Sequence, residues 1–184
     1  MRILPPSLVL SAAVSLSPAA FAATTLSGIE GMTATVFQEE QSSFSGIGLR
    51  VAFQSDELIP GIAFLPAIEY WRNSTKVQVQ AGGVIRAERR DATLSFDGRY
   101  SFHYRNFAPY VGAGFGIHFL TTEVTAPALG LPHAEDSVIK GGIGAQLGLL
   151  FPLGGKLRNF VELKYHHVTD FRQLKLNMGI SYGF

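Results

Sequence analysis

The sequence predicts an all-β fold, a transmembrane up-and-down antiparallel β-barrel of about eight strands. Three observations support this prediction. Apolar and polar residues alternate with a period of two along most of the chain. The alternating segments are about ten residues or longer, which is the length that a tilted strand needs to cross a bilayer. The chain has 20 Gly and 14 Phe, and outside the N-terminus runs of strong helix formers are scarce.

The first residues have the pattern of a secretory signal peptide. Arg2 supplies a positive charge, an apolar stretch follows as far as Val14, and Ala20–Ala22 forms a small-x-small cleavage site. We therefore expect residues 1–22 to be removed and residues 23–184 to form one barrel domain. An N-terminal membrane anchor is the alternative, and the apolar run is too short for it.

Composition excludes several classes of function. Cysteine is absent, which rules out disulfides and thiolate metal sites. Removal of residues 1–22 takes away one base and no acid, so 14 Lys+Arg then balance 14 Asp+Glu. A balanced chain has no general reason to bind nucleic acid. The five histidines form no convincing metal set, and we expect no cofactor.

The alternation is clearest in the segment 91–105. Its even positions, from Ala92 to Tyr104, are mostly aromatic or aliphatic, and its odd positions, from Asp91 to Arg105, are polar or charged. Successive strand residues point to opposite faces, so each face meets a different environment. Strands are expected over 29–38, 45–54, 61–72, 91–105, 108–122, 136–151, 157–168 and 173–184.

The joints between these segments alternate in length. Short joints are expected at 55–60, 105–107 and 152–156, and long ones at 73–90 and 123–135. Short turns at one end and long loops at the other are typical of outer-membrane barrels. Two further joints, 39–44 and 169–171, are short although this scheme places them at the long-loop end.

A water-soluble sandwich or barrel would also alternate, but with its apolar face inward. Here the polar faces carry charges of both signs, glycines and histidines, which suit a narrow interior. The apolar faces carry aromatic residues near the strand ends, such as Trp71 and Tyr100, as in membrane-interface girdles. We therefore expect the apolar face to point outward, towards lipid.

The C-terminus resembles the β-signal of bacterial outer-membrane proteins. Asn177, Gly179, Tyr182 and Phe184 occupy its polar, glycine, aromatic and terminal phenylalanine positions. In that family the outer-membrane assembly machinery receives the barrel through this strand, a form of β-augmentation. The resemblance therefore implies this machinery as a partner.

Residues 23–184 resemble, mostly as a pattern, the small-barrel superfamily of the OmpA transmembrane domain, OmpX and the opacity-related surface antigens. The closest run is Phe160–Tyr165, which is followed by a short loop and the Phe-terminated strand. The resemblance implies a location in the bacterial outer membrane, among its lipid and lipopolysaccharide. It implies no single activity.

The charged residues on the polar faces are candidates for a network in the barrel interior. An eight-stranded barrel is barely wide enough for its own side chains, and buried charges must pair or be solvated. We expect a salt-bridged plug, and a narrow ion path through the same charges is the alternative. The candidates are Arg50, Glu69, Asp97, Arg99, Lys140, Glu162 and Lys164.

The segment His166–Asp170 loosely resembles the His-x-Ser-Asn element of lipid A deacylase barrels. His167 would match the histidine and Thr169 the serine, while Asp170 replaces the asparagine. A hydroxyl nucleophile needs a base, and the base needs an orienting acid. No glutamate follows Asp170, so we favour a polar cluster at the outer interface over a catalytic site.

The long joint 73–90 is basic. Valines on both sides of Gly82 and Gly83 suggest a hairpin that extends the barrel wall outward. Its arginines Arg86, Arg89 and Arg90 are candidates to contact lipopolysaccharide phosphates. Pairing of its edge with a partner strand and a simple solvated loop are the alternatives.

Taken together, the sequence predicts an integral outer-membrane surface or structural protein with a filled interior. Its expected roles are adhesion to a host or matrix ligand, or maintenance of outer-membrane integrity. A lipid A-modifying hydrolase and a narrow porin-like channel are the alternatives, because this scaffold supports all of them.

Overall fold

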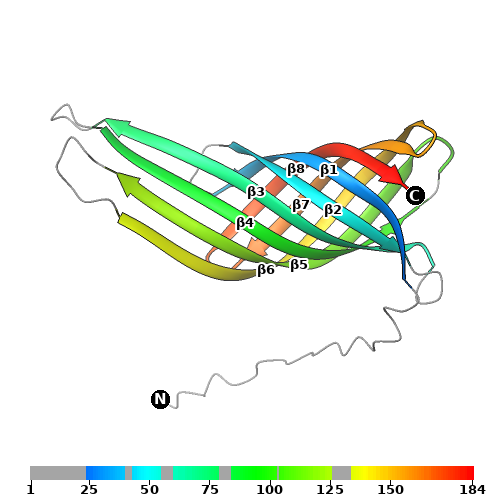
Figure 1. The fold of residues 1–184 in the computed structure, drawn as a ribbon, viewed down its shortest axis with the longest axis horizontal. Helices are drawn as coiled ribbons and strands as arrows, with labels where there is room; N and C mark the ends of the chain where they lie inside the picture. The colour runs from blue at the N-terminus through cyan, green and yellow to red at the C-terminus, as the bar shows by residue number, and fades with distance from the viewer. Residues whose placement is uncertain (1–23, 40–42, 55–59, 79–83, 103, 126–133) are drawn as a thin grey trace, which may run out of the picture.

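The structure is a computed structural model that describes residues 24–39, 43–54, 60–78, 84–102, 104–125 and 134–184 (Figure 1). The predicted signal peptide lies outside these residues. Within the described residues, no helix is long and apolar enough to cross a membrane.

Eight antiparallel strands close into one barrel in which every strand pairs with its neighbours along the chain and β1 pairs with β8. The predicted fold class is therefore confirmed. The strands are β1 (Thr25–Gln38), β2 (Phe44–Gln54), β3 (Ile62–Gln78), β4 (Val84–Ser101), β5 (Ala108–Thr125), β6 (Ala134–Gly154), β7 (Leu157–Val168) and β8 (Phe171–Gly183).

The barrel wall has its apolar face outside. Ile139 and Ile143 are each 67% exposed, whereas Glu30, Arg50 and Glu162 have no exposed area. This is the reverse of a water-soluble barrel, in which apolar side chains fill the centre. The predicted orientation of the two faces is confirmed, and an apolar wall of this kind requires a bilayer around it.

Two apolar clusters lie inside the barrel near its two ends. The first joins Met32, Tyr110, Leu150 and Phe160, and the second joins Ala34, Val36, Phe44 and Trp71. Buried polar and charged side chains occupy much of the remaining interior.

Glycines on the inner face make room for rings on the adjacent strand. Phe160 lies directly opposite Gly179, and Tyr110 directly opposite Gly148. A Cβ atom on Gly179 would lie 2.7 Å from the Phe160 ring, which is far inside van der Waals contact. Glycine therefore sets how closely these rings can approach the wall.

The two ends of the barrel differ. The end that holds the β4–β5 and β6–β7 turns also holds the start of β1 and the end of β8, and we call it the turn end. Gly154 and Gly155 shape the β6–β7 turn with φ values of 128° and 57°, a region that favours glycine. At the opposite end, strands β3 to β6 extend well past the other four (Figure 1).

This extension is a four-stranded sheet, which we call the projecting sheet and define as residues 72–78, 84–90, 121–125 and 134–137. Its β3–β4 pairing continues to Gln78 opposite Val84, and its β5–β6 pairing to Val124 opposite Ala134. The predicted hairpin in 73–90 is therefore confirmed. The expectation that 73–90 is mainly a long loop was wrong, because 73–78 and 84–90 are strand. In the joint 123–135, strands β5 and β6 include 123–125 and 134–135, and residues 126–133 lie outside the described residues.

Candidate functional site

The barrel interior holds many buried charged side chains. Near the turn end, both guanidinium Nη atoms of Arg50 donate to the Glu162 carboxylate, at 2.8 and 2.6 Å. Glu162 also accepts from Asn177 Nδ2 at 2.7 Å and from the Tyr110 hydroxyl at 3.1 Å. A single buried carboxylate thus has four donors, which is the arrangement that makes a buried charge tolerable.

Further along the barrel, two lysines are held between two acids. Lys164 Nζ lies 2.7 Å from Asp97 Oδ2 and 3.5 Å from Glu69 Oε1, and Lys175 Nζ lies 2.5 Å from Glu69 Oε2. All four side chains are at most 5% exposed. They join β3, β4, β7 and β8 across the centre of the barrel.

A third group lies nearer the projecting sheet. His118 Nδ1 is 2.7 Å from Asp91 Oδ2 and 3.0 Å from Thr93 Oγ1, and its Nε2 is 3.1 Å from His166 Nδ1. The side chains of His118 and Asp91 have no exposed area, and His166 is 1% exposed. Although these groups resemble parts of a catalytic relay, their burial keeps them from a substrate.

The structure brings six of the seven predicted interior charges into these networks. Arg50, Glu69, Asp97, Glu162 and Lys164 make the contacts above, and Arg99 Nη2 lies 2.7 Å from Glu30 Oε1. Lys140 is the exception. It pairs at 2.8 Å with Asp170 at the barrel rim, where the two side chains are 22% and 70% exposed.

Several interior residues that complete these networks were not among the candidates predicted from the sequence. Glu30 and Lys175 lie on the polar faces of predicted strands, so the period of two could have identified both. Asp91 lies on the polar face predicted for 91–105, but its contact with His118 spans two strands and is visible only in the fold.

The suggested hydrolase residues are not assembled into a catalytic group. His167 is exposed on the outer wall, and Thr169 Oγ1 donates to the carbonyl oxygen of Gly141 at 3.3 Å. Within the described part of the chain, no hydrogen bond joins His167 to a hydroxyl or to an acid. The neighbouring Asp170 is instead paired with Lys140.

The residues of the C-terminal signature lie in β8 and at its end, with alternating roles. Asn177 points inward and donates to Glu162, and Gly179 leaves room for Phe160. Tyr182 and Phe184 are 43% and 59% exposed on the outside, with ring centroids 5.7 Å apart. Asn177 and Gly179 of this signature therefore have a packing role within the folded barrel.

The outer face of the β3–β4 hairpin carries a cluster of charges. Arg86 and Arg90 lie on this face, but Arg89 points to the other face, in line with Asp91, because side chains alternate along β4. The structure therefore separates Arg89 from its two predicted companions. Arg72, which the prediction did not include, lies directly opposite Arg90, and Lys76, which belongs to the predicted basic joint, lies directly opposite Arg86.

Glu88 lies at the centre of this cluster. Its two carboxylate oxygens accept from Arg72 Nη2 and Arg90 Nε, and Arg90 also reaches Glu123 at 3.2 Å. The hydrogen bond from Arg72, with that from Arg90, lowers the pKa of Glu88. The carboxylate is therefore ionised at neutral pH.

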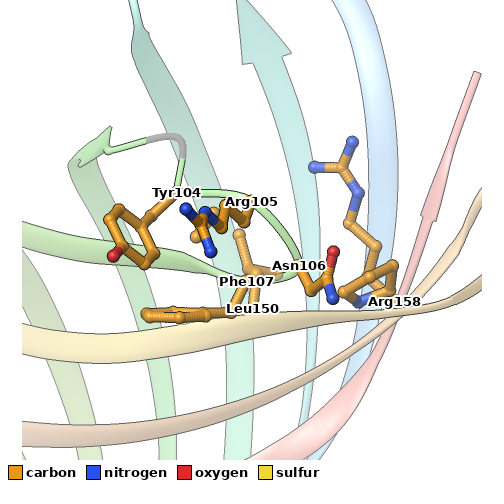
Figure 2. A pocket seen from close by; sticks show the side chains of 8 residues that line it. Tyr104, Arg105, Asn106, Phe107, Leu150 and Arg158 are labelled. Carbon is orange, nitrogen blue, oxygen red and sulfur yellow. The ribbon is translucent and has the colours of Figure 1, made fainter.

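A cleft of about 220 Å³ lies at the turn end (Figure 2). The β4–β5 turn forms one side of it, with Tyr104 and Phe107 in the turn and Arg105 at a φ of 39°. Leu150 and Pro152 of β6 and Arg158 of β7 line the rest. The lining is mostly apolar and offers no nucleophile beside a base. Across the described residues, no group of three or more His, Cys, Asp and Glu side chains could hold a metal ion.

Together, the closed antiparallel barrel, the apolar wall and the ionic interior define a small transmembrane β-barrel. No protein family profile matches the sequence, and no curated protein sequence does. Solved structures do match.

The chain is similar to a major outer membrane protein from Thermus thermophilus, with 15% identity, a TM-score of 0.67 and coverage of 87% of this chain and 100% of that one. It is also similar to Neisserial surface protein A, with 15% identity, a TM-score of 0.62 and coverage of 88% and 99%. A third similar structure is Ail, the attachment invasion locus protein of Yersinia pestis, with 12% identity, a TM-score of 0.58 and coverage of 88% and 98%.

These likenesses identify the fold as that of the small outer-membrane barrels. The predicted resemblance to that group is confirmed at the level of fold. The predicted location in the bacterial outer membrane agrees with these likenesses and with the apolar wall.

Proposed function

We propose that this chain is an outer-membrane surface protein with a closed interior, which attaches the cell to a host or matrix ligand through its projecting sheet. The observation that carries the proposal is the sheet itself. Four of the eight strands continue several residues past the apolar wall, whereas the β7–β8 turn at Thr169 and Asp170 is short. A structure that served only to span the membrane would not need this extension.

The paired interior supports the closed state. Glu162, Lys164 and Glu69 hold their partners across the barrel at hydrogen-bond distance, and apolar clusters flank them near both ends. An ion that entered would have to displace buried ion pairs, which costs several kcal/mol or so. Recordings from the purified protein in planar bilayers should therefore show no stable single-channel current.

The projecting sheet supports an external role. In outer-membrane barrels both termini lie on the periplasmic side, which places the turn end inside and the projecting sheet outside. One barrel of similar fold is described as an attachment invasion locus protein and was crystallised with the heparin analogue sucrose octasulfate. That description concerns the other protein, and it suggests the kind of ligand to test here.

Adhesion can be tested with cells that display the full-length protein. In one variant, residues 73–89 are replaced by a two-residue Asn-Gly turn, which closes the hairpin where Arg72 lies opposite Arg90. In a matched variant, residues 122–136 are replaced in the same way, between Thr121 and Ser137. Both variants should keep the barrel, which a gel-mobility assay for folded protein would verify.

We expect cells with the full chain to adhere to immobilised heparin and matrix protein, and at least one trimmed variant to lose adhesion. The proposal would be wrong if cells with the full chain adhered no better than cells without the protein. It would also be wrong if both trimmed barrels, correctly folded, adhered as well as the full chain.

A further inference from the structure

The outer faces of strands β3 to β6 change abruptly from apolar to charged. Directly opposed residues form rows across the four strands. The last apolar row is Tyr70, Ala92, Phe119 and Ile139, and the next is Arg72, Arg90, Thr121 and Ser137. The following rows are Ser74, Glu88, Glu123 and Glu135, and then Lys76, Arg86 and Thr125. The cations therefore lie over β3 and β4, immediately past the apolar wall.

The cations on β3 and β4 are placed in a way that is unusual for paired strands. Arg72 lies directly opposite Arg90, and Lys76 directly opposite Arg86. Like charges in directly opposed positions destabilise a sheet. Glu88 contacts Arg72 and Arg90, and Glu123 contacts Arg90, so these two carboxylates neutralise only part of the charge of the four cations. The hairpin therefore favours an anion from outside the chain.

Arg72 and Arg90, the inner pair next to the apolar wall, are positioned to bind such an anion. Glu88 accepts from Arg72 and from Arg90 and is only 7% exposed, while the two arginine side chains remain 58% and 43% exposed. A guanidinium has five N–H donors, so most of the donors of Arg72 and Arg90 remain available. Planar guanidinium groups match the oxygens of a phosphate in a bidentate manner.

The outer pair, Lys76 and Arg86, makes no ion pair with an acid among the described residues. Both side chains are exposed. Glu123 and Glu135 lie over β5 and β6, and Glu123 contacts Arg90 from that side. The two cations of the outer pair are therefore the most accessible to an external anion.

The distances of these cations from the bilayer centre indicate which class of membrane lipid could contact all of them. A strand rises about 3.4 Å per residue and tilts by about 40°, so Lys76 lies roughly 10 Å farther from the bilayer centre than Arg72. The headgroup layer on each side of a bilayer is only about 6 Å deep. A simple phospholipid that contacts Arg72 could not also reach Lys76, whereas a glycolipid with several charged groups could.

We infer that the outer face of the β3–β4 hairpin binds the phosphate groups of a phosphorylated glycolipid of the lipopolysaccharide class, through Arg72, Lys76, Arg86 and Arg90. This inference rests on the proposed outer-membrane placement of the chain and not on adhesion. It names a partner beside the barrel in the membrane that contacts the outer face of the β3–β4 hairpin, whereas the proposed adhesion uses the projecting sheet as a whole.

The test uses the full-length mature protein, refolded in detergent, and the affinity of each variant for labelled lipopolysaccharide. Arg86→Gln and Arg89→Gln make a matched pair, because they remove the same charge from nearby positions on opposite faces of β4. One cation close to an anionic surface contributes a factor of about five in affinity. We therefore expect Arg86→Gln and Lys76→Gln each to weaken binding about fivefold, and Arg89→Gln to change it less than about twofold.

Three further probes separate the possible ligands: dephosphorylated lipopolysaccharide, inorganic phosphate and heparin. We expect dephosphorylated lipopolysaccharide to bind weakly and equally to all variants, and neither soluble anion to compete at matched phosphate or sulfate concentration. Equal losses for Arg86→Gln and Arg89→Gln would overturn the inference, because they would indicate a general charge effect. Tight binding of the dephosphorylated lipid, or full competition by heparin, would also overturn it. The comparison of Arg86→Gln with Arg89→Gln on lipopolysaccharide does not depend on whether the projecting sheet supports adhesion.

Discussion

The substitution Glu162→Gln is the sharpest test of the ionic interior. Glu162 receives both Arg50 donors, at 2.8 and 2.6 Å, as well as Asn177 and Tyr110. Neither Arg50 nor Glu162 has any exposed side-chain area. The amide keeps the shape of the carboxylate but removes its charge, which leaves Arg50 buried without its principal partner.

The expected magnitude follows from this burial. Removal of one member of a buried ion pair costs about 3–5 kcal/mol. Glu30 Oε2 lies 3.8 Å from Arg50 and compensates in part, so we expect the lower half of this range, about 3–4 kcal/mol. The matched control is Lys140→Met, which breaks a rim pair with Asp170 and should cost about 0–1 kcal/mol.

The assay is urea unfolding of the protein in lipid vesicles, followed by fluorescence. The chain has one tryptophan, Trp71, which is 2% exposed inside the barrel and should report the loss of the interior. The double variant Arg50→Met with Glu162→Gln removes both charges. It should recover most of the lost free energy of unfolding, because neutral replacement of a buried pair is often tolerated.

A cost below about 1 kcal/mol for Glu162→Gln would refute the reasoning, because a pair that weak behaves like a solvated surface pair. A double variant no more stable than the Glu162→Gln protein would also contradict it. In that case the cost would not come from an uncompensated charge on Arg50.

Three further predictions concern the wall, the interior and the charge cluster. Leu94 is 48% exposed on the lipid face, so Leu94→Arg should destabilise the barrel by about 2–4 kcal/mol in vesicles, as measured by the shift in urea midpoint. A Cβ on Gly114 would collide with Asp97 Oδ1 and with the carbonyl oxygen of Phe96, so Gly114→Ala should cost about 1–3 kcal/mol in the same assay. The pKa of Glu88 is lowered in the folded hairpin. Its contribution to stability should therefore be complete above its unfolded pKa of about 4.3 and be lost as the pH falls through the lower folded value. Proteolysis of the β3–β4 hairpin should accelerate in that acidic range, and Glu88→Gln should abolish the acceleration.

The barrel wall was largely predictable from the sequence because a bilayer imposes a strict period. Lipid contacts every second residue of each spanning strand, so the apolar positions from Leu94 to Tyr100 and from Leu174 to Tyr182 identify the outer face directly. The same alternation predicted that Arg50, Glu69 and Glu162 lie on the inner face. The extension of β5 and β6 was missed because, past the last apolar row, no lipid requires alternation. Arg89 was grouped with Arg86 and Arg90 for the same reason.

The sequence by itself therefore determined the fold class, the orientation of the two faces and most of the residues in the interior, since these depend on local periodicity. Only the tertiary structure decided which of those residues meet, because Arg50 and Glu162 are 112 positions apart in the chain and face each other across the barrel. It also decided that Lys140 lies at the rim and not in the interior. The odd or even position of a residue in a strand predicts which face it is on, but not how far along the barrel axis it lies. The opposition of Arg72 and Arg90 likewise depends on the register between β3 and β4, which a hairpin fixes by its turn and not by its composition.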